Sequence, residues 1–202
     1  RFDPGMLYYS PQIWCSDDTD AIERLSIQEG TELIYPLSTI GAHVSDCPNH
    51  TVGRTTPFMT RAHVALAGTF GYELDITKIS DKERAMIPEQ VALYHKYSDL
   101  VREGDYYRIA SYSENGLYDC WMVVAKDKSE ALVTYVQVLG KPNVHSGKIK
   151  LLGLDEAADY RLDGTDKVYG GDLLMNAGLL IEKMCGDYMS RLYHFVLDNS
   201  LT

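Results

Sequence analysis

The sequence has few cysteines, no cluster of basic residues and no long apolar run, and each absence excludes a class of protein. The four cysteines are scattered without a Cys-x-x-Cys pair, which argues against a disulfide framework and a thiolate metal site. We expect free thiols in a reducing cytoplasm. No apolar stretch approaches the roughly 18 residues that a membrane-spanning helix needs. The formal net charge of −10 disfavours binding to nucleic acid or to anionic lipid.

Motifs for nucleotide binding and for serine hydrolases are also missing, whereas acidic residues are concentrated at one point. Residues 17–20 (Asp-Asp-Thr-Asp) place three carboxylates in four positions, after an aromatic-rich stretch and before a helical pattern. A carboxyl group walled by Trp14 and by Tyr8 or Tyr9 would be shielded from water, and burial raises the proton affinity of a carboxyl group. The alternative is that these residues only cap the following helix. Spacing alone leaves both interpretations open.

The first half of the sequence alternates strand-like and helix-like segments, which is typical of a parallel sheet with crossover helices. Capping-box patterns at residues 20–23 and 80–83 mark two helix starts, and Pro57 opens a third helix. We expect Pro88 to break the last helix near its start. The predicted strands cover residues 6–14, 41–44 and 69–74, and the predicted helices cover residues 20–33, 57–68 and 80–104.

After Gly104 the apolar period changes to two, which predicts an antiparallel sandwich. We therefore expect a β/α part over residues 1–104 and an all-β part over residues 105–202. Three β/α units are fewer than the eight of a closed barrel, so the chain looks like the C-terminal piece of one. The predicted strands of the second part cover residues 106–112, 120–125, 131–139, 149–152, 173–181 and 191–197.

Several motifs resemble one known family in order and in spacing. Residues 5–14 (GMLYYSPQIW) lead directly into residues 16–25 (SDDTDAIERL), and three shorter motifs follow: VGR at 52–54, TFGYELD at 69–75 and GDLLMNAGL at 171–179. Together they resemble the bacterial α-galactosidases, or melibiases, of glycoside hydrolase family 36. The resemblance spans nearly the whole chain.

The resemblance implies that residues 1–104 are the last units of a catalytic (β/α)8 TIM barrel and that residues 105–202 are a C-terminal antiparallel β-sandwich domain. It implies a retaining α-galactosidase acting on oligosaccharides such as melibiose and raffinose, without metal or organic cofactor and often as a homo-tetramer. The family's nucleophile lies on an earlier strand, in a Lys-Trp-Asp context that has no counterpart here. We therefore expect this chain to need the missing N-terminal part of the same enzyme and to be inactive alone.

By the same resemblance Asp18 falls on the family's general acid/base, with Asp17 as its rival. Asp18 is preferred because the related eukaryotic α-galactosidases carry one acid that lines up better with the second aspartate. Asp17 would then contact substrate or, with Asp20, hold the turn. Trp14 is expected either to wall the sugar pocket or to be a core aromatic residue.

Other interpretations remain at this level. His43, Cys47 and His50 could form a metal corner or a Cys–His nucleophile pair, although no fourth ligand is suggested nearby. The strand-like aromatics of the second half, such as Trp121 and Tyr193, could bind sugar, but they also suit a pleated, half-buried surface. A galactosyltransferase that extends raffinose-type sugars and a non-catalytic sugar-binding or assembly fragment are the two alternative functions.

Overall fold

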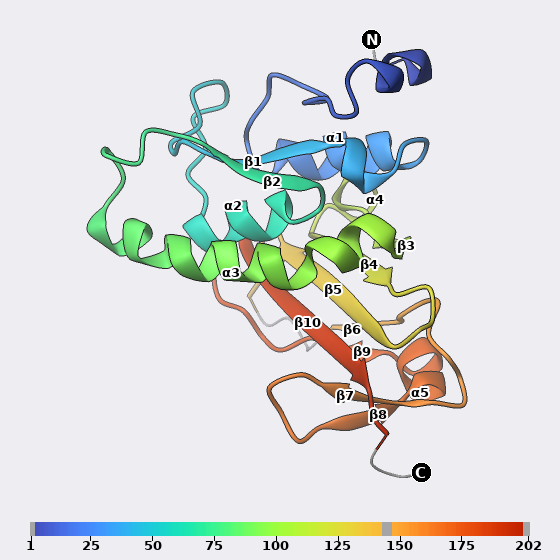
Figure 1. The fold of residues 1–202 in the computed structure, drawn as a ribbon. Coiled ribbons are helices and arrows are strands. Elements are labelled where there is room, and N and C mark those ends of the chain that lie inside the picture. The colour runs from blue at the N-terminus through green and yellow to red at the C-terminus, as the bar shows by residue number, and fades with distance from the viewer. Residues whose placement is uncertain (1–2, 143–146, 200–202) are drawn as a thin grey trace. The chain divides into compact units, whose positions relative to one another are not determined.

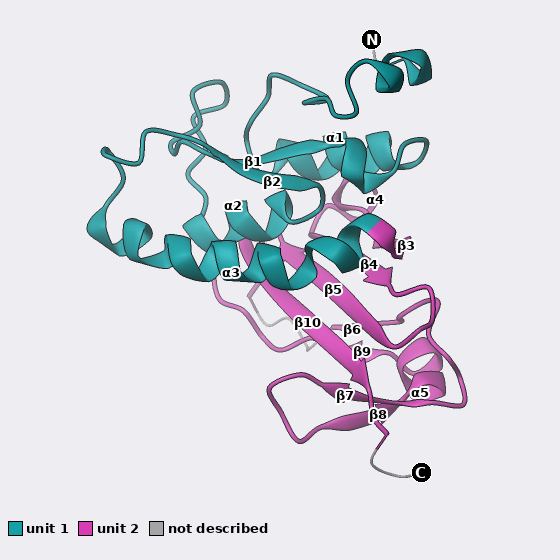
Figure 2. Cartoon of the chain, viewed as in Figure 1, with its two compact units in different colours: residues 1–102 teal, residues 103–202 magenta. Residues whose placement is uncertain are grey.

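A computed structural model describes residues 3–142 and 147–199, which form two compact units. Unit 1 comprises residues 1–102 and unit 2 residues 103–202 (Figure 2). All four cysteines are free thiols, as expected. Within the described ranges no helix has the length and apolar character needed to cross a membrane.

Unit 1 is built on parallel pairing between strands that are joined by helices (Figure 1). Strand β1 pairs with β2 in parallel, in a register from Gly41↔Thr69 to Ser45↔Glu73, and Ile13 forms one parallel bridge to Ile40 on the other side. The predicted β/α alternation is therefore confirmed from Ile13 onward. Its elements are η1 (Pro4–Tyr8), α1 (Glu23–Glu32), η2 (Leu37–Thr39), β1 (Gly41–Ser45), α2 (Phe58–Ala65), β2 (Thr69–Glu73) and α3 (Asp81–Glu103).

The predicted strand over residues 6–14 is wrong for most of its length. Asp3 accepts a hydrogen bond from the Gly5 amide at 2.8 Å, and Pro4 follows at the first helical position, so the chain starts as the short 3-10 helix η1. Only Ile13 pairs like a strand, because its amide donates to the Thr39 carbonyl at 2.9 Å and its carbonyl accepts from the Gly41 amide at 2.7 Å. Tyr8 and Tyr9 are exposed and do not wall the acidic run in the described chain.

Helices α2 and α3 pack on one face of the β1–β2 pair. Phe58, Ala62 and Ala65 of α2 form a buried apolar cluster with the even-numbered residues of β1, and side chains from β2 and the start of α3 pack against it. The capping box of α3 is confirmed, since the Glu83 amide donates to Ser80 Oγ and the Ser80 amide donates to Glu83 Oε2, each at 3.2 Å.

The expected break at Pro88 is wrong, because α3 runs through it without interruption. Gln90, fully buried two residues later, accepts from Tyr72 Oη at 2.9 Å and donates to the Phe58 carbonyl at 3.2 Å. These tertiary hydrogen bonds hold the helix against β2 and α2 and outweigh the local preference against proline.

Unit 2 is an antiparallel sheet of six strands in the order β3-β4-β5-β10-β7-β8, with a separate two-stranded pair β6-β9. One face of the large sheet shares a buried apolar core with Ile149 of β6, Leu174 of α5 and Leu179 of β9. Trp121 and Tyr193 are buried, so they are core residues. The elements are β3 (Asp105–Ala110), α4 (Tyr112–Asn115), β4 (Tyr118–Val124), β5 (Glu130–Gln137), β6 (Lys148–Ile149), β7 (Asp159–Leu162), β8 (Val168–Gly170), α5 (Gly171–Asn176), β9 (Leu179–Leu180) and β10 (Met189–Leu197).

The predicted strand over residues 173–181 is also wrong, because α5 occupies its first half and only Leu179–Leu180 is a strand. Gly178 has a φ of +88°, which ends the helical segment in a conformation that glycine adopts without strain. The short hairpin of β7 and β8 was not predicted.

Candidate active site

The face of the β1–β2 pair that points away from α2 carries polar side chains. Because side chains alternate along a strand, His43 and Ser45 lie opposite the apolar residues of β1 that pack on α2. The parallel register places Gly71 beside His43 and Glu73 beside Ser45. We call this set (His43, Ser45, Gly71 and Glu73) the polar face.

Gly71 and Gly41 have no side chains, which leaves space for the rings of His43 and Trp14. A Cβ atom on Gly71 would lie 3.1 Å from Cδ2 of His43, and one on Gly41 would lie 3.1 Å from Cδ1 of Trp14. The two rings meet edge to face, with centroids 5.2 Å apart, and Trp14 Nε1 donates a hydrogen bond to the imidazole. Burial, followed by the nearby charge of Arg24, lowers the pKa of His43, which keeps the ring neutral and able to accept this bond.

Trp14 also borders a large open cavity beside the acidic run. Trp14 and Asp17 line this cavity of about 710 Å³, together with side chains from the end of α1 and the residues after it. Trp14 is 37% exposed in this chain.

The chain leaves Trp14 through a tight turn centred on Cys15. Cys15 has a φ of +63°, and the Ser16 amide donates to the Trp14 carbonyl across it at 2.7 Å. A non-glycine residue in this region is strained and persists only where its surroundings hold it. The turn brings Asp17 into the wall of the cavity.

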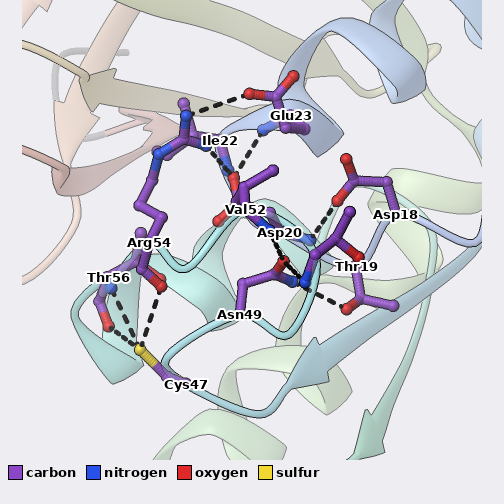
Figure 3. Close-up of polar contacts among 11 residues, drawn as sticks. Asp18, Thr19, Asp20, Ile22, Glu23, Cys47, Asn49, Val52, Arg54 and Thr56 are labelled. Atoms are coloured by element: carbon purple, nitrogen blue, oxygen red, sulfur yellow. Dashed lines mark hydrogen bonds and ion pairs between the residues drawn. The ribbon is translucent and has the colours of Figure 1, made fainter.

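The three aspartates of the run have different surroundings. Asp17 is exposed and lines the cavity. Asp18 is half-buried, and its Oδ1 accepts from the Asp20 amide at 3.0 Å, so its carboxylate is turned toward the backbone that leads into α1 (Figure 3). Asp20 is buried, and its Oδ2 accepts from the amides of Ile22 and Glu23, each at 3.0 Å. Helix capping, one of the two interpretations of the acidic run, is therefore confirmed for Asp20.

Asp20 also forms an ion pair with Arg54, the arginine of the VGR motif (Figure 3). Arg54 pairs with Glu23 at 3.1 Å through its other nitrogen. Burial disfavours the charged guanidinium, but the hydrogen bond to Glu23 and the charge of Asp20 outweigh it and raise the pKa of Arg54. The expected capping box at residues 20–23 is thus only half formed, because the Glu23 side chain turns to Arg54 and not to the cap residue.

The loop over residues 47–56 is a folded support for this ion pair. Asn49 is buried; its Oδ1 accepts from the amides of Thr51 and Val52 at 2.9 and 3.0 Å, and its Nδ2 donates to Thr19 Oγ1 at 3.2 Å (Figure 3). Cys47 Sγ accepts from the Thr56 amide at 3.3 Å. Across residues 3–142 and 147–199 no three His, Cys, Asp or Glu side chains are grouped in a way that could hold a metal ion.

Two charged residues near the acidic run were not assigned to the site from sequence. Glu73, at the carboxyl end of β2, has its pKa raised by burial and by the charges of Asp46 and Asp17, against the opposing effects of His50 and Arg24. Arg24 is buried and donates to backbone carbonyls, including that of Trp14 at 2.9 Å.

Comparison with known proteins identifies the family to which the chain belongs. The model described as Melibiase matches residues 1–104, which is more than half of the chain. The chain belongs to the melibiase family. A second model, Glycosyl hydrolase family 36 C-terminal domain, matches residues 118–195. The resemblance seen in the motifs is therefore confirmed.

Named relatives agree with this membership. The chain is 51% identical to alpha-galactosidase AgaA of Geobacillus stearothermophilus over 96% of its length, and 47% identical to alpha-galactosidase Mel36A of Lactobacillus acidophilus over 96%. It covers 26% of each of these relatives, so it spans about a quarter of their length. A crystal structure of an AgaA variant in complex with raffinose superposes with a TM-score of 0.94 at 48% identity, covering 98% of this chain and 27% of that one.

Proposed function

We propose that the complete protein is a retaining α-galactosidase that releases terminal α-linked galactose from oligosaccharides such as melibiose and raffinose. The observation that carries the proposal is the acidic turn of residues 16–18, which follows Ile13 and Trp14 beside the parallel strands of a melibiase-family chain. The relatives are named alpha-galactosidases, and AgaA variants have been solved with raffinose and with stachyose.

In this proposal unit 1 supplies the last β/α units of a (β/α)8 barrel and unit 2 is the C-terminal β domain. The parallel order of Ile13, β1 and β2, with α1 and α2 between them, supports the first part. The acidic turn follows Ile13 and Trp14, on the side where strands β1 and β2 also end. Barrel enzymes assemble their sites at the carboxyl ends of the strands.

A retaining glycosidase needs two carboxyl groups about 5–5.5 Å apart, one that attacks the anomeric carbon and one that handles the proton. In the first step the glycosidic C–O bond breaks, the nucleophile bonds to the anomeric carbon, and the acid protonates the departing oxygen. In the second step the same group, now a carboxylate, takes a proton from water as the water displaces the nucleophile. The nucleophile belongs to the part of the enzyme that precedes this chain.

Asp17 or Asp18 supplies the acid, and the family resemblance favours Asp18. Asp18 is half-buried, and one of its oxygens accepts a hydrogen bond from the Asp20 amide, which holds the carboxyl group in place. A group that protonates a sugar oxygen must reach it directly or through one water molecule. We give Asp18 the acid/base role and keep the exposed Asp17 as the alternative. Trp14 packs against the apolar face of the sugar.

Trapping tests this function in the full-length protein. A mechanism-based galactose inhibitor should label one carboxylate outside the present 202 residues, and a structure of the adduct should place the Asp18 carboxyl group across the anomeric carbon from it. A product analysis with raffinose should give free galactose. Transfer of galactose to a second sugar as the main reaction would favour the transferase alternative.

A further inference from the structure

The side chain of Arg24, in the first turn of α1, is bonded almost entirely to main-chain oxygens. It is 5% exposed, and its Nη1 donates to the carbonyls of Trp14 at 2.9 Å and Ser16 at 3.4 Å. Its Nη2 donates to the carbonyl of Gly41 at 3.0 Å. One buried guanidinium therefore joins the acidic turn to the start of β1.

These carbonyls flank the strained residue of the turn. Trp14 and Ser16 are the neighbours of Cys15, whose φ is +63°, and the acidic run follows at once. A strained backbone conformation persists only when surrounding contacts hold it, and Arg24 supplies such contacts on both sides of Cys15. The direction in which the acidic run leaves the turn thus depends on Arg24.

A second side chain fixes the guanidinium itself. Gln28 is buried one helical turn later; its Oε1 accepts from Arg24 Nε at 3.3 Å, and its Nε2 donates to the Val64 carbonyl at 3.0 Å, just before the end of α2. The planar fork of arginine can reach carbonyls of two chain segments at once, whereas a lysine ammonium on a flexible stem cannot fix the same geometry.

We propose that Arg24 is a positioning residue, which holds the Trp14–Ser16 turn against β1 and so fixes the carboxyl group that delivers the proton. This inference rests on the proposed function. It assigns no contact with substrate to Arg24. The expected defect of an Arg24 variant is therefore specific: the acid is misplaced, while the nucleophile and the rest of the pocket are intact.

The test uses Arg24→Lys in the full-length protein, with two substrates that differ in their need for an acid. Raffinose has a poor leaving group, whereas 2,4-dinitrophenyl α-galactoside needs little protonation. We expect kcat/KM for raffinose to fall about 10²-fold, as for a misplacement of about 1 Å, and kcat/KM for the dinitrophenyl substrate to fall less than about threefold. Arg102→Lys, an exposed arginine of α3, is the matched control and should leave both values unchanged.

Active-site titration with the mechanism-based inhibitor expresses each rate per competent site, so partial unfolding does not imitate the effect. If Arg24→Lys does not fold, Gln28→Met removes the partner of Nε and should show a smaller selective loss. An equal loss on both substrates, or failure of both variants to fold, would overturn the inference and leave Arg24 a stabilising residue. If neither Asp17→Asn nor Asp18→Asn makes the rate depend on the leaving group, the proposed function itself is wrong. If one of these two variants shows that dependence and Arg24→Lys does not, only the role proposed for Arg24 is wrong.

Discussion

Replacing Asp20 with alanine should lower the free energy of unfolding of the full-length protein by about 4 kcal/mol. Asp20 has two structural roles: it caps α1 through the amides of Ile22 and Glu23, and it forms an ion pair with Arg54. Loss of a cap costs about 1 kcal/mol. Breaking a buried ion pair costs about 3–5 kcal/mol. We use the lower end of this range, because the Arg54 side chain is 23% exposed and retains its ion pair with Glu23 in the variant.

Urea unfolding followed by tryptophan fluorescence measures this loss. Asp20→Asn retains a side-chain oxygen for the cap and should cost about 3 kcal/mol, which separates the charge from the capping contribution. Asp17→Asn is the matched control, because Asp17 is exposed, and should change stability by less than about 0.5 kcal/mol. A loss below about 1 kcal/mol for Asp20→Ala would refute the idea that this ion pair supports the acidic turn.

Two further predictions follow from the missing nucleophile and from a buried histidine. The isolated 202-residue chain should hydrolyse no aryl α-galactoside. Steady turnover by this chain would contradict the proposal that one of the two catalytic carboxyl groups lies outside it. Burial lowers the pKa of His63 to about 4, so the unfolded chain binds a proton before the folded one does as the pH falls. The stability contributed by neutral His63 should be complete above pH 6.5 and should fall by about 3 kcal/mol toward pH 4; His63→Met should remove this slope in urea unfolding at a series of pH values.

Local signals predicted the parts of the fold whose stabilising contacts are local. The capping box at Ser80 and Glu83 depends on contacts within four residues, and it is present. The stretch over residues 6–14 was mispredicted, because a strand depends on its neighbours and only Ile13 has one among the described residues. The apolar run at 173–181 was ambiguous between helix and strand, as short apolar runs are.

Sequence likewise predicted some features of the candidate site and not others. The acidic run and its position after a strand end could be anticipated from sequence. Which aspartate faces the cavity could not, because that depends on the turn at Cys15. The role of Arg24 could not either, since its partners are carbonyls from two segments that only the fold brings together.

The most direct measurement compares Asp17→Asn and Asp18→Asn in the full-length protein, on raffinose and on 2,4-dinitrophenyl α-galactoside. Asp18→Asn should lower turnover of raffinose by about 10²–10⁴-fold, the range for loss of an acid/base group, while the first step with the dinitrophenyl substrate proceeds almost unchanged. Asp17→Asn should lower both rates by less than about tenfold. The reverse order would assign the acid/base role to Asp17, and a pair of variants without any dependence on the leaving group would contradict acid catalysis from this turn.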